Sequence, residues 1–423
     1  MNQLKALLGW VDDRFPLTAN WKAHLSEYYA PKNFNFWYFF GALSMLVLVM
    51  QIVTGILLTM HYKPDASQAF ASVEYIMRDV PSGWLIRYMH STGASMFFIV
   101  IYLHMFRALM YGSYRKPREL LWLFGMLIYL CLMAEAFFGY LLPWGQMSYW
   151  GAQVIVNLFG AIPFVGPDIS LWIRGDYVVS DATLNRFFAF HVIAVPLVLL
   201  GLVAAHLLAL HEVGSNNPDG IEIKKKKDPK TGIPLDGIPF FPYYVIKDIV
   251  GVVVFLMVFS AIVFFAPEMG GYFLEHNNFV PADPLKTPLH IAPVWYFTPF
   301  YSILRAVPPL FNSQFPGVVA MGLSVMILFL MPWLDRGAVK SIRYRGPLFK
   351  GALALFVVAF LVLGYLGTEP TNLWGQFGSW LGGAERATVV ARIFTIIYFL
   401  FFLLMPWYTK IDKTRPEPER VTS

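Results

Sequence analysis

Long apolar runs alternate with short polar or aromatic segments along the whole chain. Eight of these runs are long enough to cross a lipid bilayer, which takes about 20 helical residues. They lie at residues 37–61, 84–110, 120–141, 185–210, 245–266, 317–334, 348–367 and 391–408. The pattern predicts an all-α membrane protein with eight transmembrane helices, the first four of which form a bundle.

Composition agrees with this interpretation. The 423 residues are 57% hydrophobic and only 14% charged, which excludes a soluble multidomain protein of the same length. Cys131 is the only cysteine, so the chain has neither an iron–sulfur ligand set nor a Cys-x-x-Cys-His haem attachment. Any such centre must belong to another subunit.

Basic residues gather in alternate connections, after the second, fourth and sixth spans and at the end of the chain. They are Arg115, Lys116, Arg118, Lys224, Lys225, Lys226, Lys227, Lys230, Arg336, Lys340, Arg343, Arg345, Lys410 and Lys413. Because cytoplasmic loops are enriched in Lys and Arg, we expect these loops and both termini to face the cytoplasm of a bacterial inner (plasma) membrane. The net charge of +6 fits this orientation better than nucleic-acid binding.

Four domains are expected. Residues 1–35 form an amphipathic surface segment without a signal-peptide pattern, and residues 36–215 form the four-helix bundle. Residues 216–244 form a cytoplasmic loop, and residues 245–423 form the C-terminal helices with a long outer loop.

Two spans carry paired histidines, which are expensive inside a membrane. His90 and His104 are fourteen residues apart in the second span; this spacing places both on one helix face, roughly 21 Å apart along the axis. His191 and His206 are fifteen apart in the fourth span, where a kink at Pro196 can absorb the extra residue.

The predicted orientation makes these two spans parallel, so His90 pairs with His191 near the outer face and His104 with His206 near the inner face. Only two side chains are supplied at each level, whereas a zinc site needs three or four, so the pattern indicates two bis-histidine haem irons. For any single histidine, a hydrogen bond across a helix interface is the open alternative.

Glycines repeat the spacing of the first histidine pair, and arginines lie close to the histidines. Four glycines, two in the first span and two in the third, are fourteen apart in each span and provide room for macrocycle edges: Gly41, Gly55, Gly125 and Gly139. Three arginines close to the histidines can neutralise haem propionates: Arg87, Arg107 and Arg186. Ordinary small-residue helix packing and interfacial arginines are the alternatives.

Two aromatic and proline-rich segments, 139–166 and 281–308, follow the third and fifth spans on the predicted outer side. Such segments can enclose an apolar pocket at the membrane boundary. On the inner side, His211 ends the fourth span and Lys247 and Asp248 begin the fifth. A His and an Asp there can exchange protons with a quinone, although interfacial helix capping explains them equally well.

Five motifs carry a resemblance to a known family: GYLLPWGQMSYWG (139–151), NRFFAFH (185–191), HLLALHEVGSNNP (206–218), PYYVIKD (242–248) and PVWY (293–296). From about residue 34 to 407, the chain resembles cytochrome b of the ubiquinol–cytochrome c reductase (Complex III) family. The resemblance implies two haem b groups, and ubiquinone or menaquinone as substrate. It also implies a Rieske iron–sulfur subunit, a cytochrome c-type haem subunit and a homodimeric complex as partners.

The resemblance further implies that quinol is oxidised at an outer pocket and quinone is reduced at an inner pocket, with protons translocated. The outer pocket takes Tyr140, Gly151, Ile155, Pro293, Trp295, Tyr296 and Tyr301. The inner pocket takes His211, Ser215, Lys247 and Asp248.

The chain departs from the family pattern at Val294, where many relatives have a Glu that is assigned to the second quinol proton. Glu135, one turn before Gly139, is the hypothesised substitute, and His290 is the other candidate. The extra residue before His206 resembles plastoquinol-oxidising relatives, but those are split into two chains, so the respiratory interpretation is kept. A cofactor-free transporter or proton channel, and a haem b membrane anchor of a dehydrogenase, are the alternative functions.

Overall fold

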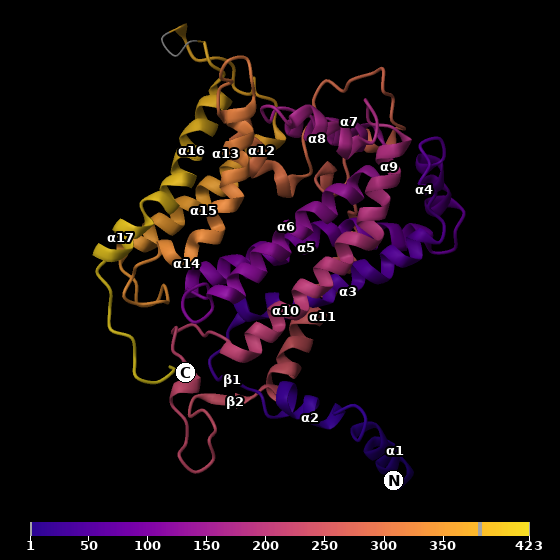
Figure 1. Cartoon of the computed structure of the whole chain (residues 1–423). Helices are drawn as coiled ribbons and strands as arrows, with labels where there is room; N and C mark the ends of the chain where they lie inside the picture. The colour runs from indigo at the N-terminus through magenta and orange to yellow at the C-terminus, as the bar shows by residue number, and fades with distance from the viewer. Residues whose placement is uncertain (1, 380–382, 423) are drawn as a thin grey trace.

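The computed structural model describes residues 2–379 and 383–422. In this part of the chain, eight helical segments are long and apolar enough to cross a membrane. They are Phe36–Thr59, Gly83–Tyr111, Glu119–Leu141, Asp181–Val213, Phe240–Phe265, Phe315–Leu334, Pro347–Thr368 and Arg386–Leu403. Each overlaps one predicted run, so the eight-span all-α fold is confirmed (Figure 1).

The first four spans pack as two helix pairs. Helix α3 (Phe39–Thr59) packs against α5 (Gly83–Tyr111), and α6 (Glu119–Leu141) packs against α10 (Val195–Val213). Helix α5 is the most buried span, and it ends at Gly112, which adopts the left-handed conformation (φ +64°) that lets its N–H cap the carbonyl of Ala108. The histidines of α5 therefore lie on the most enclosed helix of the molecule.

The fourth span is not a continuous α-helix. It consists of α9 (Asp181–Ala189), the π-helical turn η3 (Phe190–Ala194) and α10. A π turn holds one more residue than an α turn. Helix η3 therefore accommodates the one extra position by which the His191–His206 interval exceeds the His90–His104 interval. The predicted irregularity exists, but it lies at η3 rather than at Pro196, which occupies the first turn of α10, where a missing N–H costs least.

The C-terminal spans join the same core. They comprise α11 (Val245–Phe265), α13 (Phe315–Met326), η9 (Ile327–Leu330), α14 (Met331–Leu334), α15 (Pro347–Thr368), α16 (Arg386–Leu403) and α17 (Met405–Ile411). The short helix α12 (Thr298–Ala306) packs against α13, α15 and α16, and α11 packs against α3 and α5. Buried residues of both halves, such as Phe98, Phe300 and Phe402, form one hydrophobic cluster. The four-domain division stays a prediction.

One end of the molecule is covered by short helices. They are α4 (Ala69–Arg78), α7 (Gln146–Gly160), α8 (Gly166–Arg174), η6 (Met269–Gly271) and η7 (His276–Phe279). The short helix η8 (Trp295–Phe297) lies deeper and packs against the middle of α5. A second buried cluster, which includes Ala69, Leu141, Tyr149 and Leu184, ties α4, α6, α7 and α9 together. This outer layer lies at the end opposite the chain termini (Figure 1).

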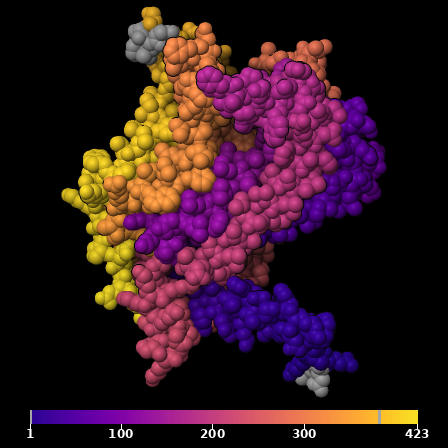
Figure 2. All heavy atoms as spheres, in the orientation of Figure 1, coloured from indigo at the N-terminus to yellow at the C-terminus, as the bar shows by residue number. Residues whose placement is uncertain are grey.

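The N-terminal and C-terminal segments both lie at the other end of the molecule (Figure 1). Strand β1 (Tyr29–Pro31) pairs antiparallel with β2 (Gly237–Pro239), and the remaining short elements there are α1 (Asn2–Asp12), α2 (Leu17–Trp21), η1 (Lys22–Ser26), η2 (Phe36–Tyr38), η4 (Ile223–Lys225) and η5 (Phe240–Tyr244). The C-terminal tail is fastened to the same region by Arg420, which donates to Asp236 at 2.7 Å. Figure 2 shows the N-terminal segment projecting from the body of the molecule at this end.

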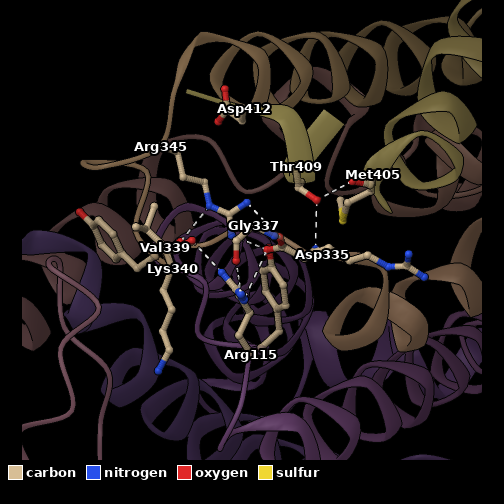
Figure 3. A network of polar contacts seen from close by, with 12 residues as sticks. Arg115, Asp335, Gly337, Val339, Lys340, Arg345, Met405, Thr409 and Asp412 are labelled. Atoms are coloured by element: carbon tan, nitrogen blue, oxygen red, sulfur yellow. Dashed lines mark hydrogen bonds and ion pairs between the residues drawn. The ribbon is translucent and has the colours of Figure 1, made fainter. Parts of the chain in front are cut away.

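The basic loops at this end form a buried polar network (Figure 3). Asp335 accepts hydrogen bonds from Arg345 at 3.0 Å and 2.5 Å and from Tyr114 at 2.6 Å, and Arg115 lies 3.8 Å from the same carboxylate. Burial by itself raises the pKa of Asp335, but the Arg345 guanidinium and its other partners outweigh burial and lower that pKa. The network joins the loop after α5 to the loop after α14.

Candidate functional site

The four histidines come together as two pairs at two levels. His90 on α5 and His191 on η3 have ring centres 6.2 Å apart and ring planes at 89°. Both line a cavity of about 330 Å³, here called the outer cavity. His104 and His206 both line a second cavity of about 940 Å³, here called the inner cavity. The pairing is the one expected from parallel second and fourth spans.

The spacing of the outer pair suits two axial ligands of one metal. Two metal–nitrogen bonds of about 2 Å, plus roughly 1 Å from each nitrogen to its ring centre, separate two axial imidazole centres by about 6 Å. The described residues contain no group of three or more His, Cys, Asp or Glu that could hold a metal ion. The donor set therefore fits an iron porphyrin better than a zinc site.

Each histidine faces a glycine of a neighbouring helix. A Cβ added at Gly55 would lie 3.3 Å from the His90 ring, and one at Gly139 would lie 2.4 Å from the His191 ring. At the inner level, the corresponding distances are 3.5 Å from Gly41 to His104 and 3.3 Å from Gly125 to His206. The absence of side chains at these points leaves backbone surface beside each imidazole, as a flat ligand requires.

Two of the three predicted arginines line the cavities. Arg87 lines the outer cavity, and Arg107 lines the inner cavity with one guanidinium nitrogen 3.3 Å from His104 Nδ1. The Nε atom of Arg107 is buried and has no hydrogen-bond partner among the described residues, which leaves it free for an anionic group of a ligand. Arg186 is exposed, donates to the Trp172 carbonyl and is not among the described residues that line either cavity.

The Nδ1 atoms of the outer histidines have protein partners. Thr54 Oγ1 lies 2.9 Å from His90 Nδ1. The backbone carbonyl of Glu135 lies 3.0 Å from His191 Nδ1, and the Glu135 carboxylate lies at the same distance from that nitrogen. A partner at Nδ1 fixes the ring orientation and leaves Nε2 for a metal. Sequence reasoning missed Thr54, since nothing in its span distinguishes it from other small polar residues.

The outer cavity is walled by residues of the predicted quinol pocket. Tyr140, Val294 and Tyr296 line it together with His90 and His191. Tyr296 is held by a ring stack on Phe98, with centres 3.9 Å apart.

The other predicted members of that pocket are not themselves among the described residues that line the outer cavity, and two of them contact residues that do. Trp295 donates from Nε1 to Ser95 Oγ at 3.1 Å, and Ser95 lines the cavity. A Cβ at Gly151 would lie 3.5 Å from the Tyr140 ring. Ile155, Pro293 and Tyr301 are not among the described residues that line the cavity.

All four predicted inner-pocket residues, His211, Ser215, Lys247 and Asp248, line the inner cavity with His104 and His206. Two further lining residues were missed, His24 and Tyr28 of the N-terminal segment. The His24 and His211 rings are 4.9 Å apart and nearly perpendicular, and Tyr28 Oη lies 3.1 Å from Ser215 Oγ. Their only signal is a His and a Tyr four residues apart in an amphipathic segment.

Sequence reasoning also missed Glu275. Its carboxylate accepts a hydrogen bond from the Tyr140 hydroxyl. Burial raises the pKa of Glu275 to about 7, although the hydrogen bond from Tyr140 acts in the opposite direction. Of the two carriers proposed from sequence, Glu135 lines the outer cavity with its Oε1 3.0 Å from His191 Nδ1, and its role stays a prediction. His290 is not among the described residues that line the cavity, and its Nε2 lies 2.8 Å from the Thr368 carbonyl.

Two family models match the chain. One, described as cytochrome b/b6/petB, matches residues 25–214, and the other, described as cytochrome b (C-terminal)/b6/petD, matches residues 281–399. Together these ranges cover well over half of the sequence and include all four paired histidines. The chain belongs to the cytochrome b family.

Similar proteins agree with this family. Cytochrome b of Allochromatium vinosum is 65% identical over 421 residues, covering 98% of each chain. Cytochrome b of Rhodospirillum rubrum is 48% identical and covers 98% of this chain and 96% of its own length. A solved structure, of a hyperthermophilic respiratory Complex III, has a TM-score of 0.85 and 39% identity, over 96% of this chain and 99% of that one.

As a cytochrome b, the protein is a multi-pass membrane protein and the haem-bearing core of Complex III, a quinol–cytochrome c oxidoreductase. Family membership implies that it binds haem b and works with partner subunits in a respiratory complex. It decides against the cofactor-free transporter and the dehydrogenase anchor.

Proposed function

We propose that this cytochrome b holds two haem b groups, one between His90 and His191 and the other between His104 and His206. The observation that carries the proposal is that each of the four imidazoles faces a glycine on a neighbouring helix. Arg87 and Arg107, one at each cavity, are positioned to pair with haem propionates. When bound, the haems supply one-electron transfer between the two levels.

The outer cavity oxidises quinol. Tyr140 offers its hydroxyl to the quinol, while Tyr296 is fixed by its stack on Phe98 and by a 2.6 Å hydrogen bond from Tyr102 to its backbone carbonyl. Trp295 is anchored by Ser95, and Gly151 leaves room beside the Tyr140 ring. Ile155, Pro293 and Tyr301 are carried over from the family pattern as the surrounding wall.

Quinone is reduced at the inner cavity. The same residues serve ubiquinone or menaquinone, since both present two carbonyl oxygens. His211 and Asp248 supply the two protons, and Ser215 and Lys247 bind and orient the ring. Tyr28 holds Ser215 in place through their 3.1 Å contact.

The partners follow from membership of the Complex III cytochrome b family. The first electron leaves to a Rieske iron–sulfur subunit and then to a cytochrome c-type haem subunit, and the single cysteine of this chain agrees with an iron–sulfur centre on another subunit. The complex is a homodimer in a bacterial inner membrane. Both termini and the basic loops face the cytoplasm, which puts the inner cavity on the side of proton uptake.

The test separates the two cavities. Asp248→Asn in the purified complex should leave quinol-driven reduction of the b haems through the outer cavity unchanged. Re-oxidation of the b haems by quinone should slow by about 10²-fold, because a positioned proton donor contributes at least that much. Asp228→Asn, which removes a carboxylate outside the inner-cavity lining, is the matched control. Equal re-oxidation in the Asp248→Asn variant and the parent contradicts the assignment.

A further inference from the structure

The outer cavity lacks a carboxylate where the family pattern most often has one. Val294 is apolar and only 7% exposed, so this position can neither accept nor pass a proton. Among the described lining residues, the only carboxylate is Glu135; its Oε1 lies 3.0 Å from His191 Nδ1, and its buried Oε2 has no hydrogen-bond partner among the described residues, so it offers a place for one proton. Quinol oxidation releases two protons, so a second acceptor must reach this cavity from elsewhere.

Glu275 lies directly behind the wall of the outer cavity. Its carboxylate accepts the hydrogen bond of Tyr140, whose side chain lines the cavity. The neighbouring residues Phe273, Leu274 and Asn278 line the cavity themselves, so this loop forms part of the wall. Tyr140 therefore stands between the cavity and the carboxylate.

The loop that carries Glu275 is fixed rather than loosely attached. Asn278 Oδ1 accepts from the Ser148 backbone N–H at 2.9 Å, and the Gln146 N–H donates to the Val280 carbonyl at 2.9 Å. A bridge between Gly145 and Pro281 continues this attachment to the start of α7. These contacts hold Glu275 at a constant distance from Tyr140.

Few titratable groups face Glu275. Tyr140 faces it from α6, and Tyr296 is close enough from η8 to interact with its charge. On its own loop, His276 and Glu268 form a separate 3.4 Å pair whose side chains are 71% and 39% exposed. Glu275 thus lies between a buried phenol on one side and a solvent-exposed segment on the other.

Building on the proposed quinol oxidation, we propose that Glu275 is the acceptor of the second quinol proton and stands in for the carboxylate missing at Val294. The quinol O–H bond breaks and its proton passes to the Tyr140 oxygen, while Tyr140 gives its own proton to the Glu275 carboxylate. The phenol is regenerated and Glu275 becomes a carboxylic acid. The electrons leave by the established oxidoreductase route, and Glu275 then releases its proton to the outer face.

The proposed role of Glu275 determines how the rate of quinol oxidation changes with pH. Burial raises the pKa of Glu275 to about 7, so the carboxylate is mostly protonated below that pH and cannot accept. Quinol oxidation should therefore increase as the pH rises through about 7. An acceptor with a pKa near the working pH is what general base catalysis favours.

The test is steady-state quinol–cytochrome c reduction by the purified complex from pH 5.5 to 9, with b-haem absorbance as the measure of assembly. Glu275→Gln should lower the rate by about 10²-fold and abolish its rise through neutral pH. Glu268→Gln, on the same loop, should behave like the parent. The double variant Glu275→Gln with Val294→Glu should recover most of the rate, because it restores a carboxylate at the motif position.

The outcomes distinguish this inference from the function on which it rests. If the parent complex oxidises quinol and Glu275→Gln keeps the same rate and pH profile, the role of Glu275 is overturned and the proposed function stands. A parent that does not oxidise quinol overturns the proposed function. If Glu275→Gln fails to retain haem, Tyr140→Phe is measured instead; it keeps the carboxylate but interrupts the relay, and an unchanged rate and profile overturn the proposal.

Discussion

The four glycines do not approach their histidines equally. A Cβ at Gly139 would meet the His191 ring at 2.4 Å, closer than side chains ever lie, whereas a Cβ at Gly41 would meet His104 at an ordinary 3.5 Å. Gly139→Ala must therefore displace the imidazole, at a cost of about 1–3 kcal/mol for overpacking. We expect it to lose most of the outer b-haem signal in reduced-minus-oxidised spectra.

Gly322→Ala is the matched control, because it adds the same methyl group to a helix glycine that has no atom within 4 Å of its added Cβ and that is not among the described lining residues of either cavity. It should retain both haem signals. Equal haem loss in the two variants would mean that helix packing, rather than the imidazole contact, determines the effect.

Glu135 gives a second prediction at the residue scale. Its backbone carbonyl and its carboxylate both lie 3.0 Å from His191 Nδ1, and a carboxylate there increases the electron donation of a metal-bound imidazole beyond what the backbone carbonyl alone supplies. Glu135→Gln should therefore raise the midpoint potential of the outer haem while leaving that of the inner haem unchanged. Potentiometric titration of the two b-haem components measures this, and an unchanged outer potential contradicts the contact.

Sequence reasoning at this scale worked where one helix determines the geometry. The spacing of His90 and His104 fixes their shared face, and the glycines follow the same interval. It did not find Glu275, because the partner of that residue, Tyr140, is 135 positions away and their contact depends on how a long loop folds over α7. The roles of the individual site residues remain predictions.

At the scale of elements, the π turn in the fourth span has a direct test. Ile193 lies within η3, and its side chain is 60% exposed, so its removal leaves no buried cavity. Deleting Ile193 leaves the histidines fourteen residues apart, the spacing found in α5, so a regular α-helix then keeps them within about 40° of one face. We expect the deletion variant to retain both haems.

Inserting one Ala after Ile193 is the opposite change. It rotates His191 by about 100° relative to His206, so one haem should be lost from the haem-to-protein ratio. Retention of two haems in the insertion variant, or loss of one in the deletion variant, would show that the π turn does not set the register.

The spans themselves could be predicted because a membrane helix has to be long and apolar whatever it packs against. The π turn could not be predicted, since two histidines fifteen residues apart can be brought to one face by a kink, by overwinding or by a bulge. Pro196 was the visible helix breaker in the sequence, but its position in the first turn of α10 requires no kink there.

At the scale of the whole molecule, the Asp335 network joins loops that are more than 200 residues apart in the chain (Figure 3). Asp335→Ala leaves the buried Arg345 without its carboxylate, and removal of one partner of a buried ion pair costs about 3–5 kcal/mol. We expect a clearly lower thermal unfolding midpoint for the purified complex, followed by loss of b-haem absorbance.

Glu74→Ala breaks an exposed ion pair with Arg78, which is worth about 0.3–0.5 kcal/mol, and serves as the control. A midpoint shift of the same size in both variants would contradict the buried role of Asp335. From the sequence, these basic loops were interpreted only as orientation signals. Their acidic partners could not be assigned without knowing which loops meet.

The central claim is that two haems are bound at two levels between α5 and the fourth span. The most direct measurement is a potentiometric titration of the purified protein's b-haem absorbance together with its haem-to-protein ratio. We predict two haems per chain and two separate one-electron transitions, of which His191→Ala removes one and His206→Ala removes the other. A single transition, or one haem lost identically in both variants, would contradict the account.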